Sequence, residues 1–529
     1  MKNPKHLLLF FSLIAFLFSC KQETEQKGKT QSKLKNYQTD YLPPTFTNDN
    51  RTEKILGAKQ EIHILFEEYA QKRNIPGISY GIVVDDSMTL SGNYGKINLE
   101  TEEKATTNSC FRIASMTKSF TAMAILKLRD EGLLDLDDPL SNYFPKLANL
   151  GYLTSDAMEI DLENLLTMTA GFPEDNPWGD RHLDDSNEEF EQLLSEGFSF
   201  SNVPSYEYEY SNTGYALLGQ VINKVTGITY QKYITQNILL PLGMKDTYWE
   251  FEEVPENILV KGYAYDQNQW IDEPLLHDGI FGSMGGMITT IKDFSKYVSF
   301  HLSAWPARSE PENGPILRSS LREMHTPKFP RLASKNTDWN NELCPTLVGY
   351  GYGLGITQYC NGVIRVSHGG ALPGFASGYA FYPEYGIGVM AFGNLTYTSP
   401  LPYNNIQQLL FSTLELSPRK KSVSHILEKR KNQLLSVIDN WDYNTHKNLF
   451  ADNFILDRSW EARGKQISEI KKLSGKIDSV GSLRPRNQLR GDVTLYAENG
   501  NINLFFTLNP EADPKIQRLD LTFKSENDN

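Results

Sequence analysis

The chain has 529 residues, more than one domain usually contains, which favours two folded units with a tail. Hydrophobic residues make up 40% of the chain, so a large core is available. The formal net charge is −13 and no long cluster of lysine and arginine occurs, which argues against a nucleic-acid partner.

The first residues predict a targeting signal. Two lysines precede the apolar run 7–18, which is too short for a comfortable membrane span but typical of a signal-peptide core. The run ends at Ser19-Cys20, which resembles the cleavage box of bacterial lipoproteins and implies acylation of Cys20. We therefore expect a lipid-anchored protein of the cell envelope, periplasmic or outer-membrane, with residues 1–20 as signal and 21–50 as flexible tether. The alternative is a plain signal peptide cut nearby and a secreted product.

Three elements are predicted between residues 55 and 134. Apolar residues recur at helical spacing over 55–73, which predicts an amphipathic helix. The runs 77–84 and 88–94 predict a β-hairpin. Within residues 111–134, the apolar residues between 120 and 128 cover most faces of a helix, which predicts a buried central helix that begins at 115 and stops near Gly132.

The start of this central helix carries a hydroxyl and an amine three residues apart, on Ser115 and Lys118. On a helix the two side chains share a face, so the amine reaches the hydroxyl. A serine becomes a useful nucleophile when a neighbouring base takes its proton, and a lysine is such a base when burial lowers its pKa. The same pattern occurs at Ser32, Ser417 and Ser468. For this segment alone, a helix-capping Ser115 with a solvated Lys118 is the slightly better interpretation.

The pattern from 130 to 300 is mostly helical and rich in loops, with a helix expected at 215–227. Strand patterns return later in the chain, at 350–359, 363–367, 376–382 and 387–392. Strands at both ends with helices between them predict the α+β class. One antiparallel sheet, flanked by helices, is built from the two flanks, and the helical region is inserted between them.

The loop 173–185 has two interpretations. It borders a cleft, where Trp178 or Arg181 shapes specificity, or it is a surface loop held by tryptophan packing. We favour the surface loop.

A change of composition after residue 418 predicts a domain boundary. The main domain is expected over 51–418, and a small accessory α+β domain over 419–529. A helix at 424–440 and strands at 501–508 and 519–523 are predicted in the accessory domain, without any catalytic constellation.

Beyond the signal segment the chain has three cysteines, too few for a disulfide framework. Cys344 and Cys360 flank a strand pattern and can pair in an oxidising envelope, a point that the sequence leaves open. Cys110 is more typical of a small buried hydrophobic residue. No spacing of thiols or histidines resembles a metal site, so no metal or organic cofactor is expected.

Two further motifs offer what a serine–lysine pair needs, namely a proton relay, an orienting amide and an oxyanion hole. Tyr210 and Asn212 present a phenol and an amide just before a helix, although alone they are better interpreted as a turn with a helix cap. His368 precedes two glycines between strand patterns, where the backbone can approach a ligand closely. Alone, this histidine is simply part of a turn.

In this order the three motifs resemble the serine β-lactamase and penicillin-binding-protein family. They are most similar to class C β-lactamases, D-aminopeptidases and related esterases. The resemblance spans roughly 55–415, and the segment 368–394 is especially similar to the family's third motif and the hairpin after it. Residues 162–172 resemble a further family segment, with Met-Thr-Ala-Gly in place of the more usual His-Thr-Ser-Gly.

The resemblance implies a role for each residue. Ser115 is the implied nucleophile that forms an acyl-enzyme, and Lys118 is its general base. Tyr210 is implied to share or relay the proton, and Asn212 to orient the substrate and Lys118.

On the substrate side, the resemblance implies that His368 and Gly370 line the site and that the amides of Ser115 and Ala371 form the oxyanion hole. His368 replaces a lysine found in many relatives. A lysine is a permanent cation suited to a carboxylate, whereas a histidine is only partly charged near neutral pH. Penicillin recognition is therefore expected to be weak.

We expect a serine hydrolase that acts on ester or amide bonds, in D-amino-acid peptides or small acyl esters. A β-lactamase or DD-carboxypeptidase is the second expectation, and a non-catalytic binding protein is the alternative of another class. The chain has no Gly-x-Ser-x-Gly elbow, which argues against an α/β-hydrolase.

Overall fold

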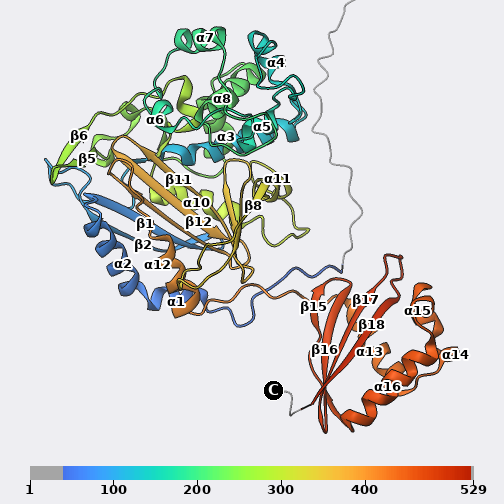
Figure 1. Cartoon of the computed structure of the whole chain (residues 1–529). Coiled ribbons are helices and arrows are strands. Elements are labelled where there is room, and N and C mark those ends of the chain that lie inside the picture. The colour runs from blue at the N-terminus through green and yellow to red at the C-terminus, as the bar shows by residue number, and fades with distance from the viewer. Residues whose placement is uncertain (1–39, 526–529) are drawn as a thin grey trace, which may run out of the picture. The chain divides into compact units, whose positions relative to one another are not determined.

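The computed structural model describes residues 40–525, and an eight-stranded antiparallel sheet forms the centre of the main domain (Figure 1). The strand order is β2-β1-β13-β12-β11-β10-β9-β8. The strands are β1 (Gly77–Val84), β2 (Ser87–Gly95), β8 (Lys328–Ala333), β9 (Thr346–Tyr350), β10 (Gly355–Gln358), β11 (Ile364–Leu372), β12 (Phe375–Tyr382) and β13 (Ile387–Gly393). The predicted signal segment with Cys20, and most of the predicted tether, lie outside the described residues.

The two flanks of the chain meet where β1 pairs with β13, with Ile78 opposite Gly393 and Val84 opposite Ile387. Both strands are buried along their whole length, as expected for the middle of a sheet covered on two faces. The prediction of one antiparallel sheet made from both flanks is confirmed, and with it the α+β fold class.

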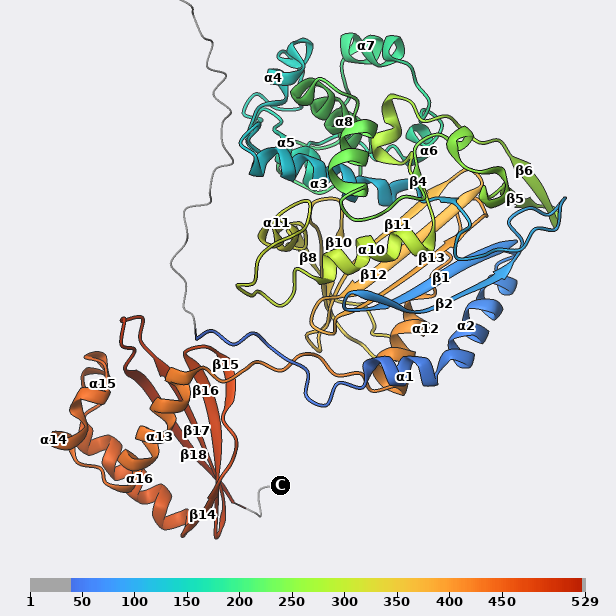
Figure 2. The same cartoon turned by 180° about the vertical axis from the view of Figure 1, so that it is seen from behind.

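One face of the sheet is covered by α1 (Arg51–Gly57), α2 (Lys59–Lys72) and α12 (Tyr403–Gln407), as Figure 2 shows from behind. The sequence predicts a single helix over 55–73, whereas the chain forms two helices that meet at Ala58. Phe66 of α2 stacks on Tyr80 of β1 with ring centroids 3.9 Å apart, which fixes α2 on the sheet.

The other face of the sheet packs against α10 (Ile291–Leu302) and the inserted helical region. The helices of that region are α3 (Thr117–Asp130), α4 (Leu140–Tyr143), α5 (Leu162–Thr167), α6 (Asn176–Gly179), α7 (Asn187–Glu196), α8 (Asn212–Thr226) and α9 (Tyr230–Ile234), and α11 (Arg318–Met324) follows α10. Short strands form two small sheets, β3 (Phe111–Arg112), β7 (Ile288–Thr289) and β4 (Thr247–Tyr248), and β5 (Gly262–Asp266) with β6 (Gln269–Glu273). These layers place α3 between the sheet and α8.

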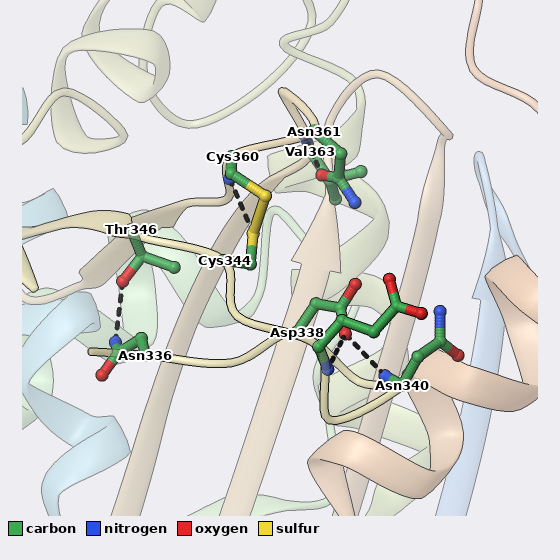
Figure 3. Close-up of a disulfide and its surroundings, with 9 residues drawn as sticks. Asn336, Asp338, Asn340, Cys344, Thr346, Cys360, Asn361 and Val363 are labelled. Atoms are coloured by element: carbon green, nitrogen blue, oxygen red, sulfur yellow. Dashed lines mark hydrogen bonds between the residues drawn. A yellow bond between two sulfur atoms is a disulfide. The ribbon is translucent and has the colours of Figure 1, made fainter. Parts of the chain in front are cut away.

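Cys344 and Cys360 form a disulfide, which settles the pairing that the sequence leaves open (Figure 3). Close by, the Asn336 side chain donates a hydrogen bond to Thr346 Oγ1 at 2.7 Å. The disulfide therefore ties the segment before β9 to the turn after β10. Cys110 is buried, as predicted, and has no disulfide partner among residues 40–525.

The residues after 418 form a second α+β unit. Its helices are α13 (His425–Asp439), α14 (Tyr443–His446), α15 (Asn453–Asp457) and α16 (Trp460–Ser474), and its strands are β14 (Ile477–Val480), β15 (Arg484–Asn487), β16 (Arg490–Ala497), β17 (Gly500–Leu508) and β18 (Ile516–Ser525). Buried residues alternate along β17, from Ile502 through Leu504 to Phe506, so one face of the sheet meets the helices.

In residues 40–525, no helix combines the length and the apolar character needed to cross a bilayer.

The main domain contains a buried pair of hydrogen-bonded histidines, His301 and His325. Trp305 Nε1 donates to His325 Nδ1 at 2.9 Å, and His325 Nε2 lies 2.8 Å from His301 Nδ1. Burial lowers the pKa of His301 to about 3 and holds that of His325 well below its usual range. Both side chains are thus neutral in the folded state.

We expect this pair to reduce stability as the pH falls below about 6.5, where the unfolded chain binds protons that the folded chain does not. The slope is about 1.4 kcal/mol per pH unit for each histidine, and stability is full above that range. Calorimetry between pH 7.5 and 5 measures it. His301→Gln should flatten the slope, whereas His425→Gln, at an exposed position, should not. Equal slopes in both variants would contradict the assignment.

Candidate active site

Ser115 lies in a 3-10 turn, Ala114–Met116, that leads directly into α3. Ala114 adopts a left-handed backbone conformation with φ of 50°, which costs free energy for a residue with a Cβ atom. The following residues, Thr117 to Leu126, are buried without interruption, so α3 is fixed on all sides. The predicted central helix is present, with Ser115 just before its first turn.

Lys118 is fully buried and makes three polar contacts. Its Nζ lies 3.1 Å from Ser115 Oγ, 2.6 Å from Asn212 Oδ1 and 2.8 Å from the Met284 carbonyl oxygen. The amide oxygen and the carbonyl oxygen only accept hydrogen bonds, so each takes one N–H of the amine. A neutral amine then directs its lone pair toward the Ser115 hydroxyl.

The pKa of Lys118 falls to about 7 because burial penalises the charged form, while the negative charges of Asp180 and Asp175 oppose the shift. The two carboxylates do not touch the amine in any hydrogen bond or ion pair among residues 40–525. Lys118 is thus partly neutral near pH 7, and the interpretation of a solvated lysine with a capping serine is wrong.

Tyr210 faces the same hydroxyl. The Lys118 amine lies 5.1 Å from the centroid of its ring. Burial raises the pKa of Tyr210 well above its usual value, and a hydrogen bond with Ser115 opposes that shift. The phenol is therefore protonated at neutral pH and is available as a donor at the serine oxygen.

Asn212 begins α8, and its placement depends on the loop before α6. Asp175 accepts hydrogen bonds from the amides of Asn212 at 2.6 Å and Thr213 at 2.9 Å, which neutralises the open amides of the helix start. The Asn212 side chain is fully buried between Lys118 and Asn176, to whose Oδ1 it donates at 3.1 Å. It positions Lys118, whereas Asn176 lines the cavity beside the site.

His368 is held by two protein partners. Its Nδ1 lies 2.5 Å from the Gly369 carbonyl oxygen, which only accepts, so Nδ1 carries the proton. Its Nε2 lies 3.0 Å from the Tyr350 hydroxyl and accepts from it. Burial lowers the pKa of His368 to about 4, and the charge of Lys118 adds to the shift. His368 is thus neutral, so the cation of the usual lysine is absent from this position.

β11 leaves a free backbone edge next to Ser115. β10 pairs with Ile364–Ser367, so the half-strand from His368 to Leu372 has no partner on that side among residues 40–525. Gly370 lies so close to the turn before α3 that a Cβ atom would come within 2.2 Å of the Ile113 carbonyl oxygen. The free edge thus includes His368, Gly369 and Gly370, and Ala371 borders the same cavity as Ser115.

A cavity of about 350 Å³ opens at these residues, a size typical of small-ligand sites. Its lining includes Ser115, Tyr210, His368, Gly370 and Ala371 from the predicted set. The predicted catalytic and substrate residues thus lie together, with Lys118 and Asn212 buried one layer behind the cavity wall.

Sequence reasoning missed part of the cavity wall, namely Asn176, Asp180, Ser377, Tyr397 and Tyr403. Asp180 is 3% exposed, and burial raises the pKa of its carboxyl above the usual range, against the opposing charge of Lys118.

The loop 173–185 therefore borders the cleft after all, through Asn176 and Asp180. Trp178 instead packs on His182 and Phe281, and Arg181 lies 3.9 Å from Glu273. The favoured interpretation of a pure surface loop is incomplete, although tryptophan packing does hold the loop.

Two solved structures have a fold similar to that of this chain. A penicillin-binding protein homologue from Pyrococcus abyssi is 22% identical with a TM-score of 0.55, and the match covers 89% of this chain and 98% of that one. A D-stereospecific amidohydrolase from Streptomyces is 24% identical with a TM-score of 0.51, covering 65% of this chain and 98% of that one. At these identities the likeness shows the fold alone.

Among known sequences, Beta-lactamase-like protein 2 of Dictyostelium discoideum is 29% identical over 273 residues. The match covers 50% of each protein, so the chain spans about half the length of this curated relative. The family model described as Beta-lactamase matches residues 63–412, the whole sheet and the inserted helices with the serine–lysine pair between them. On that match, which takes in more than half of its length, the chain belongs to the β-lactamase family.

Proposed function

We propose that this protein is a serine hydrolase that cleaves ester or amide bonds through an acyl-enzyme on Ser115. The observation that carries the proposal is the buried Lys118 amine, 3.1 Å from Ser115 Oγ, with its other contacts fixed on Asn212 and Met284. A base with a pKa near the working pH is the most effective proton acceptor.

The chemistry divides into two steps. Ser115 Oγ attacks the substrate carbonyl carbon while its proton passes to Lys118, and the oxyanion forms beside the amides of Ser115 and Ala371. The C–O or C–N bond then breaks, and the leaving group takes its proton through Tyr210. A water molecule, deprotonated by the same pair, releases the acid and restores the Ser115 hydroxyl.

A fluorophosphonate probe tests this proposal, because it reacts covalently with activated serines. The wild-type chain should be labelled, and Ser115→Ala should not be. Ser468→Ala is a matched control, since Ser468 belongs to another Ser-x-x-Lys pattern but is exposed on α16. Labelling that survives in Ser115→Ala would overturn the assignment, and no label in the wild type would favour a non-catalytic binding protein.

We rank D-amino-acid peptides and small acyl esters above β-lactams as substrates. The support is the neutral His368, both of whose nitrogens are engaged within the protein, so it offers no cation to the carboxylate beside a β-lactam amide. A panel of nitrocefin, p-nitrophenyl esters and D-alanyl amides tests the ranking. Nitrocefin turnover at a rate that rivals the esters would reverse it and favour a β-lactamase or DD-carboxypeptidase.

The pH dependence of kcat/KM should report Lys118. The rate should rise through the region of pH 7, because the proton-accepting form of the amine accumulates above its pKa. Asp180 raises that pKa, so Asp180→Asn should move the rising limb to lower pH. Asp184→Asn, which removes an exposed carboxylate of the same loop, should leave it in place. A limb that moves to higher pH in Asp180→Asn would contradict the argument.

We also propose that the chain acts in the cell envelope through a lipid on Cys20, on the support of the leader sequence alone. Expression with labelled palmitate should label the wild-type protein and not Cys20→Ser. A chain without label that appears in the medium would favour the secreted alternative.

A further inference from the structure

A second cavity adjoins the catalytic one. It has a volume of about 290 Å³ and is lined by residues of the neighbouring strands β8, β9, β10 and β11. The two cavities share a wall at Tyr350, which lines the second cavity and donates its hydroxyl to His368 of the first. Tyr208 extends this wall, with its ring centroid 5.6 Å from that of Tyr350.

Arg365 of β11 lines the second cavity and also reaches the first. Its guanidinium lies 5.3 Å from the centroid of the Tyr403 ring, and Tyr403 lines the catalytic cavity. In the described part of the chain its hydrogen bonds go to two neutral acceptors, Gln407 Oε1 at 3.3 Å and Thr357 Oγ1 at 3.4 Å. Its Nε is buried without a hydrogen-bond partner. A half-buried cation that lacks an ion pair is stabilised by an anion, which the remaining N–H groups of its two terminal nitrogens can bind.

Arg331 of β8 supplies a second positive charge to the same cavity. Its side chain is exposed, and it lies close enough to Tyr208 to act on that phenol. No aspartate or glutamate lines the cavity, and within the described part of the chain neither arginine forms an ion pair. This setting contrasts with the chain as a whole, whose net charge is −13.

The catalytic cavity has the opposite character. Asp180 is its acidic group, His368 is neutral, and neither an arginine nor a lysine lines it. A substrate with a carboxylate therefore finds no cation at the third motif, but finds Arg365 of β11 and Arg331 of β8 in the cavity on the other side of Tyr350.

We propose that Arg365 and Arg331 form a carboxylate-binding subsite for the distal end of a substrate whose scissile carbonyl lies at Ser115. The inference rests on the proposed hydrolase function and adds a substrate class, namely acyl or peptide chains with an acidic group several bonds from the cleaved bond. Arginine suits this task because its planar fork matches the two oxygens of a carboxylate. The small volume fits one such group together with a short chain.

Binding of glutarate to the full chain tests the subsite without any turnover. Calorimetric titration should show binding of glutarate, and at least tenfold weaker binding of the neutral isostere glutaramide. Arg365→Gln and Arg331→Gln should each weaken glutarate binding about tenfold, and Arg365→Lys should recover part of it. Arg73→Gln, which removes an exposed arginine directly after the end of α2, is the matched control.

Glutarate that binds no better than glutaramide, or equally well to wild type and both glutamine variants, would overturn the subsite. Because Arg331 is exposed at the edge strand, its variant should fold even if Arg365→Gln does not. Melting curves of each variant identify a folding defect.

Turnover then separates the two hypotheses. The mono-p-nitrophenyl ester of adipic acid and p-nitrophenyl hexanoate have acyl chains of equal length, with and without a terminal carboxylate. The ratio of their kcat/KM values should favour the adipate ester and fall about tenfold in Arg331→Gln. If glutarate binds but neither ester is hydrolysed, the hydrolase proposal is contradicted and the subsite is supported. If both esters are hydrolysed with equal kcat/KM values, only the subsite is contradicted.

Discussion

Replacement of Lys118 by methionine is expected to slow acylation of Ser115 by about 10³- to 10⁴-fold, the upper range for the loss of a general base. Methionine has nearly the length of the lysine stem and suits a fully buried position. It removes the proton acceptor 3.1 Å from Ser115 Oγ without adding bulk. The measurement is the burst of p-nitrophenol from an activated ester, with the melting temperature as the check on folding.

The Lys118→Met variant is also expected to have a lower free energy of unfolding than the wild type. Methionine leaves Asn212 Oδ1 and the Met284 carbonyl oxygen without their donor, which costs about 1–3 kcal/mol for each buried group. Part of that loss is offset because the variant no longer has to bury an amine, which burial disfavours in its charged form. Lys420→Met, at the exposed lysine of the Ser417 pattern, should change neither rate nor stability. A Lys118 variant that keeps more than a tenth of the rate would move the base elsewhere.

Most of the site residues were predicted from the order of the three motifs along the chain. Ser115 and Lys118 are three residues apart on one helical path, so local geometry alone brings amine and hydroxyl together. Asn212 and His368 are far away in sequence, and nothing local places them. Their meeting depends on the insertion of the helical region between the two flanks of the sheet, which the pattern of strands and helices predicts.

The sequence does not predict those contacts of the site that are made by backbone atoms or by residues of common type. The Met284 carbonyl oxygen fixes the second N–H of Lys118, and a carbonyl has no sequence signature. Asp180 and Asn176 lie in a loop with several acidic and amide residues, and only the packing of α6 on α8 selects these two. Tyr350 joins the site through the register of β9 and β10, which depends on pairing far along the chain.

The neutral state of His368 was also beyond the sequence, which indicates only a partly charged histidine. Its charge is decided by burial, by the nearby Lys118 and by the Tyr350 hydroxyl. These contacts convert a residue that titrates near neutrality into a fixed hydrogen-bond acceptor. The positive charge of the site is thus confined to Lys118 and to the arginines beyond Tyr350.

Gly370→Ala is expected to reduce kcat by about 10²- to 10³-fold, the effect of losing one oxyanion-hole donor. A Cβ atom at this position would lie 2.2 Å from the Ile113 carbonyl oxygen and 2.5 Å from Ser377 Oγ. The nearest of these atoms belongs to the backbone, which cannot rotate out of the way as a side chain can. β11 must therefore move away from the turn that holds Ser115. The amide of Ala371 moves with it, while the strain costs about 1–3 kcal/mol of stability.

Gly369→Ala is the matched control for this prediction. It makes the same chemical change one residue earlier, where the nearest atom to the new Cβ is the Ser377 carbonyl oxygen at an ordinary 3.7 Å. Its kcat and melting temperature should stay close to those of the wild type. Because both glycines lie on the free half of β11, only the approach of Gly370 to Ile113 separates the two variants. Equal activities would mean that the spacing between β11 and the Ser115 turn does not control the oxyanion hole.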